Sequence, residues 1–500
     1  MAKARVEQDA LGEVNVPDDV LYQAQTQRAV DNFSISGERV HQEIILAMMS
    51  IKAAAAGGNS QLGELNPEVA GAIIKATELA ISLDFNKHFP VDVYQTGSGT
   101  STNMNVNEVL ATLASKELGR SVHPNDDVNH GQSSNDVFPS ALQVAFVRKL
   151  KSVLFPVLDA LINQLEILAD QYQDVSKVGR THLMDAMPVT LGSEFHCWAE
   201  QTRQAYQEVW AALEQLLFLP VGGTAVGSGI NAHPDLAELI CQALSDEEAT
   251  ISAEEGITSK EHGTKWSRHV CPSTNMSGQL PAMRLSHGLK SFAIVLLKIA
   301  NDLRWMNSGP LAGLNEIQLP TLQPGSSIMP GKVNPVILES VAMVATRVVA
   351  NDVCITQAAG SGNFQLNVML PLIGQTLMQS IELLTSAGKS LTLKVLNGIS
   401  VNEEHLRQNL ESHPVLVTVL NPYIGYALAS KIAKEVIATG EPVIEVALKQ
   451  TGMEREELEA ILDTGKMTGR LKPNRVKPSQ AKSSQIKDSY ITQRFPDTDQ

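Results

Sequence analysis

Four segments of the chain are rich in glycine, hydroxyl, amide and histidine side chains and poor in residues that build a hydrophobic core. They are 96–108 (TGSGTSTNMNVNE), 123–136 (HPNDDVNHGQSSND), 179–188 (GRTHLMDAMP) and 323–335 (QPGSSIMPGKVNP). Backbone N–H groups, hydroxyls and carboxamides of this kind bind oxyanions. Two segments add a group that titrates or carries charge, His182 in the third and Lys332 in the fourth. Together the segments indicate a site for a small anion.

Each segment also has an ordinary structural interpretation. TGSGT is neither a phosphate-binding loop followed by Lys and Ser or Thr nor a dinucleotide fingerprint after a strand. The SSND sequence fits the N-cap of a helix over 137–150. A lone histidine such as His182 is more often structural, and Lys332 alone fits a solvated surface charge. The occurrence of all four segments in one chain is what favours a functional site.

The fourth segment is the most specific of the four. Gly325 and Gly331 bracket Ser326 and Ser327, which makes a mobile flap plausible, and a closing flap excludes water from a site. A serine is a poor base at its free pKa. To act as one, Ser326 needs strong local N–H donation and a nearby cation, and Lys332 is six residues away.

Long amphipathic helices must position these loops. Apolar residues recur with the spacing 4-3-4-3-4-3 from Leu285 to Met306, and similar stripes run over 366–384, 147–168, 195–216 and 337–348. A further helical stretch is expected at 41–56, and Pro156 is expected to kink the third stripe. The five stripes predict a mostly α fold with a central bundle of long helices. Because 292–299 is apolar nearly all round, we also expect a symmetric homo-oligomer.

Composition excludes several classes of function. The net charge is −15, from 39 Lys and Arg against 54 Asp and Glu, so nucleic acid and anionic membranes are not expected as partners. Four widely spaced cysteines without a CxxC pair argue against a disulfide framework or zinc site. We expect no transmembrane helix and no secretory segment, which places the protein in the cytoplasm.

The chain divides by composition into four parts. Residues 1–135 form an N-terminal lobe with anion-binding loops, and 136–394 form the central helical bundle that carries His182 and the GSS loop. Residues 395–470 are expected to form a small helical domain. Residues 471–500 are polar and locally basic, which is typical of a disordered or surface tail.

The four segments resemble, in the same order, the motifs of the fumarase/aspartase superfamily, and among its branches the class II fumarases most closely. The resemblance covers about residues 5–465. It implies a three-domain fold in which four subunits build a 20-helix core. It also implies active sites assembled from three subunits, and the reversible hydration of fumarate to (S)-malate without a metal or an organic cofactor.

The resemblance also implies roles for individual residues. Ser326 matches the catalytic base, and His182, supported by Glu339, matches the residue that handles water and protons. The positions that match substrate-binding residues are Ser98, Thr100, Ser133, Ser134, Asn135, Thr181, Ser327, Lys332 and Asn334. His123, Asn125 and Asp126 match a second, non-catalytic dicarboxylate site.

Two alternatives remain at this point. One is an aspartase-like ammonia lyase, although aspartases of the superfamily usually carry glutamine where this chain has His182. The other is a non-catalytic structural member of the fold. The presence of Ser326, His182 and Lys332 argues against the second alternative, because a site without catalytic function need not keep these residues.

Overall fold

The computed structural model describes residues 3–254 and 264–468. Among them, two compact units form. The first holds the described residues up to Leu168 and from Phe195 to Asn402, and the second holds those from Ala169 to Glu194 and from Glu403 onward. The prediction of a mostly helical chain is confirmed, since strands occur only as four short two-stranded sheets in this part of the chain. The four-part division of the sequence stays a prediction.

The N-terminal part of the first unit combines one hairpin with five helices. Its elements are β1 (Ala4–Asp9), β2 (Gly12–Pro17), α1 (Ala24–Asn32), α2 (Gln42–Gln61), α3 (Pro67–Ala80), α4 (Phe85–His88) and α5 (Thr100–Leu118). The helix expected at 41–56 is α2, which begins after the His41 cap. Helix α3 begins with the Asn66 side chain accepting from the backbone of Glu68, followed by a proline whose missing N–H is not needed there. Helix α2 packs against α3, α6 and α9.

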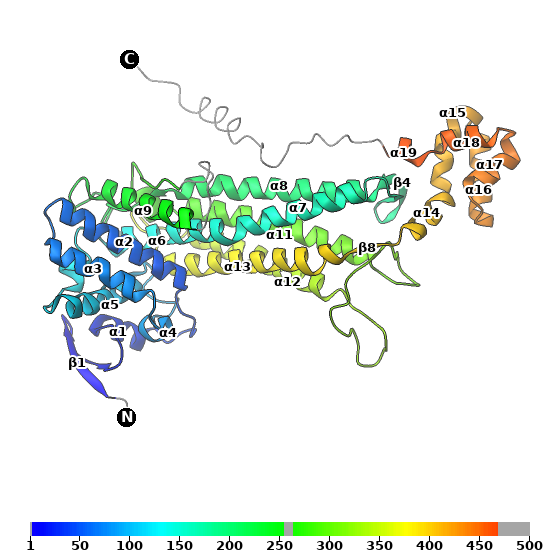
Figure 1. Ribbon diagram of the computed structural model, residues 1–500. Coiled ribbons are helices and arrows are strands. Elements are labelled where there is room, and N and C mark those ends of the chain that lie inside the picture. Colours follow the sequence, from blue (N-terminus) through cyan, green and yellow to red (C-terminus); the bar gives the residue numbers. More distant parts are fainter. Residues whose placement is uncertain (1–2, 255–263, 469–500) are drawn as a thin grey trace, which may run out of the picture. The chain divides into compact units, whose positions relative to one another are not determined.

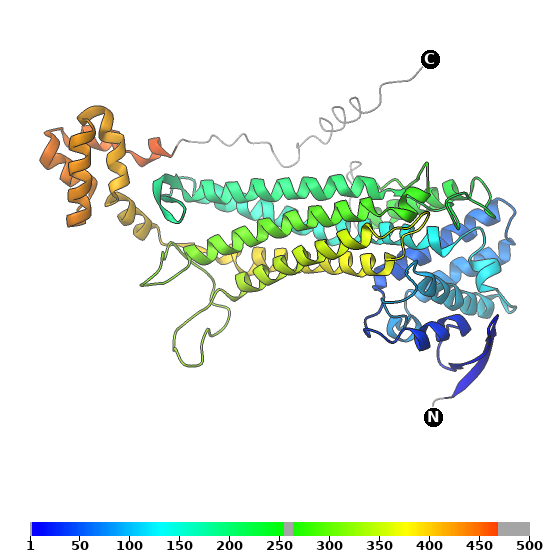
Figure 2. The ribbon, with the colours of Figure 1, turned by 180° about the vertical axis from the view of Figure 1, so that it is seen from behind.

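Four of the five predicted apolar stripes lie wholly on long helices. The stripe 366–384 begins before its helix, because Leu366 forms a bridge with Asn363 and α13 starts only at Leu370. The elements are η1 (Pro124–Val128), α6 (Ser134–Lys149), η2 (Leu150–Leu154), α7 (Phe155–Gln171), α8 (Leu191–Leu216), α9 (Leu236–Glu254), α10 (Ser273–Ser277), α11 (Leu280–Met306), α12 (Val336–Ala359) and α13 (Leu370–Lys394). Figures 1 and 2 show α11, α12 and α13 side by side. Leu289, Phe292 and Leu296 on α11 are completely buried. Burial of these stripes is the main force that holds the bundle together.

The helical stretch Ser134–Gln171, formed by α6, η2 and α7, is long and apolar enough by composition to cross a membrane, and 44% of its most apolar window is buried within the chain. Every residue from Asp136 to Val147 is buried. This part packs against α2 and α13, as a core helix of a bundle does. Before Pro156 the helix widens into the π-helical η2, where Phe155 N–H bonds the Leu150 carbonyl.

The second unit has a hairpin and a cluster of short helices. Its elements are β3 (Ser176–Thr181), β4 (Met184–Thr190), α14 (Glu403–Glu411), η5 (Pro414–Leu420), α15 (Asn421–Ile424), α16 (Tyr426–Thr439), α17 (Val443–Thr451), α18 (Arg455–Ile461) and α19 (Thr464–Met467). Its core joins Leu420, Ile432 and Val446 with Val178 from the hairpin.

The remaining elements belong to the first unit. They are β5 (Phe218–Leu219), β6 (Ser267–Arg268), β7 (Ile317–Gln318), η4 (Leu396–Gly398) and β8 (Ser400–Val401). The tail predicted at 471–500 lies outside the described residues.

A buried carboxylate fixes the first helix to the fifth. Glu108 on α5 accepts hydrogen bonds from the backbone N–H groups of Gln23, Gln25 and Thr26 at 2.9 to 3.1 Å, and from the Thr26 hydroxyl at 2.5 Å. No side chain next to α1 caps its N-terminus. Glu108 therefore performs that capping function from more than 80 residues away.

Replacing Glu108 with glutamine tests this attachment. The amide NH₂ of a Glu108→Gln variant cannot accept the N–H bonds, so we expect the free energy of unfolding to fall by about 1–3 kcal/mol. Urea unfolding at one fixed protein concentration measures it. Glu117→Gln, at an exposed position on the same helix, is the matched control and should stay within about 0.5 kcal/mol of the parent protein. Equal midpoints for the two variants would contradict the capping role.

Candidate functional site

Three hydroxyl groups join the N-termini of α5 and α6. Ser98 Oγ lies 2.8 Å from Thr100 Oγ1, and Thr100 Oγ1 lies 2.7 Å from Ser134 Oγ. We call these three residues the hydroxyl cluster. Thr100 is the first residue of α5 and Ser134 the first residue of α6. Two helix N-termini bring their partial positive charge to one place, although Thr102 N–H is already bonded to Gln95 and Asn135 N–H to Ser133. This is the local positive potential that an anion needs in this acidic chain.

Two glycines allow the chain to pass through this point. Gly99 has a left-handed backbone with φ of +76°, and a Cβ there would lie 2.2 Å from the Phe138 ring on α6. A Cβ on Gly97 would lie 1.8 Å from the carbonyl oxygen of Val368. The segment TGSGT is therefore a close-packing motif: it lets α5 begin directly against α6 and α13.

The SSND sequence forms the N-terminus of α6, as its N-cap interpretation predicts. Ser133 is the N-cap residue, with its side chain accepting from Asn135 N and its own N–H donating to the carboxylate of Asp136. The Asn135 carboxamide donates to the carbonyl of Ala225 at 2.9 Å. Ser133, Ser134 and Asn135 are half-buried beside the hydroxyl cluster. A helix cap and an anion site use the same donors, so the two interpretations do not exclude each other.

A buried pair of opposite charges lies behind the hydroxyl cluster. Lys52 on α2 is fully buried and donates to Asn129 Oδ1 at 2.7 Å. Burial lowers the pKa of Lys52 to about 7, an effect that the charge of Asp136 opposes. Burial raises the pKa of Asp136 to about 6, although backbone N–H groups and Lys52 favour its charged form. Within the described residues, no group of three His, Cys, Asp or Glu side chains could hold a metal ion.

The residues predicted for a second dicarboxylate site lie together on one exposed turn. His123 caps η1, its Nδ1 accepting from the backbone N–H groups of Asn125 and Asp126. The Asp126 carboxylate lies 3.2 Å from the same imidazole nitrogen. All three side chains face solvent, so the turn is open to a ligand, and the second site stays a prediction.

The loop before α12 folds back on itself around Ser326. Gly325 N–H donates to the Lys332 carbonyl at 2.8 Å, and Asn334 donates to the Gly325 carbonyl at 2.9 Å. Inside this closed loop, Ser326 Oγ accepts from the backbone N–H groups of Ile328 and Met329, both at 3.2 Å. Two N–H donors aimed at one serine oxygen favour a negative charge on it. Ser327 and Lys332 are exposed on the same loop.

The length of α12 separates this loop from the hydroxyl cluster. Ser326 precedes the N-terminal end of α12. Beyond its C-terminal end, Leu370 donates to the carbonyl of Gly97, next to Ser98. A helix of 24 residues is about 36 Å long. Figures 1 and 2 show the loop before α12 at the end of the bundle remote from α5. One chain therefore does not bring Ser326 to Thr100. Glu339 is exposed in the first turn of α12.

His182 lies at the tip of the hairpin in the second unit. His182 and Leu183 form the two-residue loop between β3 and β4, with φ of 57° and 60°, as in a type I′ turn. Thr181 and His182 are exposed, and so are Leu183 and Met184, at 66% and 71%. Asp185, just beyond the tip, bonds His413 at 2.9 Å. The fold thus presents His182 to solvent on an ordered support, surrounded by apolar side chains.

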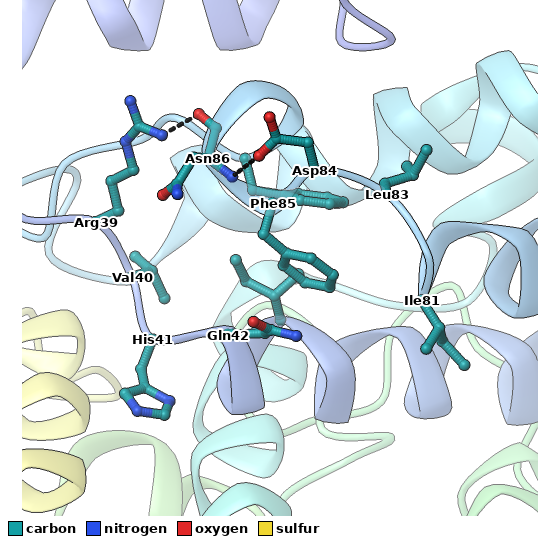
Figure 3. A pocket seen from close by; sticks show the side chains of 11 residues that line it. Arg39, Val40, His41, Gln42, Ile81, Leu83, Asp84, Phe85 and Asn86 are labelled. Carbon is teal, nitrogen blue, oxygen red and sulfur yellow. Dashed lines mark hydrogen bonds between the residues drawn. The ribbon is translucent and has the colours of Figure 1, made fainter.

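A cavity of about 470 Å³ in the N-terminal region contains none of the predicted site residues (Figure 3). Its apolar lining includes Val40, Ile81 and Phe85. At its edge, Arg39 donates to the carbonyl of Asn86, whose N–H donates to the Asp84 carboxylate at 3.0 Å. The Arg39 guanidinium and the Asp84 carboxylate are thus both bonded to the backbone of Asn86, and none of the four motif segments contributes to the lining.

Comparisons with known proteins agree with the order of the motifs. Residues 12–350 match the family described as Lyase, and 416–469 match the family described as Fumarase C C-terminus. The chain is 47% identical to Fumarate hydratase class II 2 of Pseudomonas aeruginosa over 468 residues, 94% of this chain and 99% of the relative. It is 42% identical to Fumarate hydratase class II of Thermus thermophilus, over 92% and 97%. The chain belongs to the class II fumarase family.

Solved structures of similar proteins carry the same fold. The crystal structure of class II fumarase from Schistosoma mansoni has a TM-score of 0.88 at 35% identity, covering 93% of this chain and 99% of that one. A fumarate lyase:delta crystallin from Brucella melitensis has a TM-score of 0.85 at 39% identity, covering 93% of this chain and 100% of that one. The class II fumarase fold therefore extends over both units of the chain.

Sequence reasoning missed the buried polar side chains behind the class II fumarase motifs. Lys52 lies in an alanine-rich helix, where a lysine indicates an exposed face, and Asn129 is one of several asparagines in its segment. The four-residue segment Gly222–Ala225, which contacts Asn135 and Asp136, belongs to no predicted site. Its only signal is the glycine-rich sequence VGGTAVGSG at 221–229.

Substituting Gly99 tests whether the hydroxyl cluster depends on the close approach of Gly99 to the Phe138 ring. In Gly99→Ala the new methyl group collides with Phe138, so the start of α5 must shift and the affinity for succinate should fall at least about tenfold. Gly119→Ala is the matched control, because Gly119 ends the same helix with φ of +70° and open space around it. Both variants carry the cost of a left-handed alanine, about 1–2 kcal/mol. Calorimetric titration with succinate measures the affinity, and equal affinities in the two variants would contradict the dependence.

Proposed function

We propose that this protein catalyses the reversible hydration of fumarate to (S)-malate. The observation that carries the proposal is the convergence of two helix N-termini and three hydroxyl groups in a chain of the class II fumarase family. Fumarate and malate are dicarboxylates. A carboxylate placed at the hydroxyl cluster would accept hydrogen bonds from hydroxyl and backbone donors and lie in the positive field of both helices.

In this proposal Ser98, Thr100, Ser133, Ser134 and Asn135 bind one carboxylate, and Thr181, Ser327, Lys332 and Asn334 complete the substrate site. In the dehydration direction Ser326 removes a proton from the carbon next to a carboxylate. The N–H groups of Ile328 and Met329 support negative charge on Ser326 Oγ. The electron pair left on that carbon spreads into the substrate carboxylate as an aci-carboxylate, and its return forms the C=C bond as the C2–O bond breaks.

Fixed donors and Lys332 stabilise the added charge of this intermediate more than they stabilise the substrate, and this difference lowers the barrier. His182, supported by Glu339, then provides the proton that allows the C2 hydroxyl to leave as water. Hydration runs through the same groups in reverse. Each proton and electron pair is accounted for by these side chains and water.

We further propose that several chains of a homotetramer contribute to each site. The separation of Ser326 from the hydroxyl cluster along α12 supports this, because a second copy can supply the missing loop. Apolar side chains exposed on the long helices also support it: Ile294 is 52% exposed, Met343 69% and Val353 59%. Packing such faces together gives the 20-helix core that the family resemblance implies. The cytoplasmic location stays a prediction.

Replacing Ser326 with alanine tests its role as the base. Turnover should fall by at least about a hundredfold while KM changes little, because the lost interaction belongs to the transition state. The fall in fumarate absorbance in water gives the rate. Ser34→Ala, at an exposed position outside the site, should retain parental kinetics. The same assay separates the alternatives, since an ammonia lyase would form fumarate from aspartate and a structural protein would do neither. Parental turnover in Ser326→Ala would remove Ser326 from the mechanism.

Mixing two inactive variants tests the shared site. Ser326→Ala and His182→Asn should each be nearly inactive alone. If the two residues of one site come from different chains, co-refolding equal amounts should restore about a quarter of the sites, because each contribution is intact half the time. Activity of the mixture measures this, with mixed oligomers verified by native mass spectrometry. Mixed oligomers without activity would show that both residues come from one chain.

A further inference from the structure

Asp136 connects the hydroxyl cluster to a segment outside the four motifs. Its carboxylate is completely buried. Oδ1 accepts from Ser133 N–H at 3.0 Å, and Oδ2 accepts from the N–H groups of Gly222 and Thr224, both at 2.9 Å. A single side chain therefore holds the N-cap of α6 and a glycine-rich segment nearly 90 residues later in a fixed relation.

The connected segment, Gly222–Ala225, has an unusual backbone. Thr224 is buried and has φ of +52°, a conformation that is unfavourable for a β-branched residue. Its hydroxyl oxygen is buried without a hydrogen-bond partner. The next carbonyl, that of Ala225, accepts from the carboxamide of Asn135. Two unfavourable features thus occur at one residue, directly beside a predicted substrate-binding side chain.

We propose that Gly222–Ala225 is a further part of the substrate site, and that Asp136 is the positioning residue that holds it in place and acts through Asn135. This rests on the proposed function. The Ala225 carbonyl takes one amide hydrogen of Asn135, which fixes the rotation of the carboxamide. The second amide hydrogen is then directed by that rotation and is available for a substrate carboxylate. Without Asp136, the carbonyl and the carboxamide lose their fixed relation.

The substitution Asp136→Asn breaks one side of this connection. An amide has one acceptor oxygen, and its NH₂ group cannot accept from Ser133 or from the pair Gly222 and Thr224. Because Asn135 would contact the substrate in both the ground state and the transition state, we expect KM for fumarate to rise about tenfold while kcat falls less than about threefold. Glu108→Gln is the matched control: it makes the same change at a buried carboxylate that bonds backbone N–H groups elsewhere, and it should lower the melting temperature without changing KM.

Thr224→Gly tests the role of Gly222–Ala225 in the substrate site without changing Asp136, whose variants could be unstable. Glycine adopts the left-handed backbone without strain, so the melting temperature should not fall, but the segment loses rigidity and KM should rise several-fold. Asn231→Gly is its control, since Asn231 has φ of +63° and is exposed in the same connection between β5 and α9. It should leave KM unchanged.

A double-mutant comparison tests whether Asp136 acts through Asn135. In an Asn135→Ala background, Asp136→Asn should raise KM less than about twofold further. If the two effects multiply in full, or if Asp136→Asn lowers only the melting temperature, the proposal is overturned. If the parent protein does not hydrate fumarate, the proposed function fails by itself. The dissociation constant for succinate then replaces KM in the same comparisons, with the same expected ratios.

Discussion

The length of a helix is the constraint on which the rest of this structure depends. Helix α12 carries the Ser326 loop at one end and leads, at its other end, to the segment that supports Ser98 and Thr100. An α-helix cannot be shortened or folded without losing its backbone hydrogen bonds, so this spacing is fixed. A bundle of such helices is rigid, so loops at its opposite ends cannot meet within one chain. They can meet only where one end of the bundle lies against the opposite end of the bundle of another chain. The exposed apolar residues on the same helices fit that requirement.

Buried polar side chains convert this bundle into a site of defined shape. Glu108 and Asp136 each bond several backbone N–H groups from a distant part of the chain. A buried carboxylate is tolerated only because its oxygens accept hydrogen bonds. Without these partners, its desolvation would destabilise the folded state strongly. The segments that each carboxylate connects are therefore held together either by all of these hydrogen bonds or by almost none of them. In the proposed site, Asp136 therefore fixes the donors at the N-terminus of α6 as part of the fold.

The features predictable from sequence were those with a local signal. The stripe from Leu285 to Met306 has the period of a helix, and SSND has the composition of a cap, so α11 and the start of α6 follow directly. The requirement that Ser326 receive N–H donation is met within its own loop. The buried positions of Lys52, Asn129 and Thr224 could not be predicted, because they arise from contacts between residues far apart in the chain. Pairing at such separation depends on how helices pack, which periodicity alone does not determine.

The hairpin that carries His182 stores conformational strain in its two-residue loop. His182 and Leu183 both hold left-handed backbones that glycine or asparagine would adopt more easily, while strand pairing on either side keeps them there. At this tip, stability and activity would favour different sequences. Glycine at Leu183 would remove strain and raise the melting temperature, yet it would also let the imidazole sample many directions. If His182 acts as proposed, the strain at this tip is the cost of holding its imidazole in one direction.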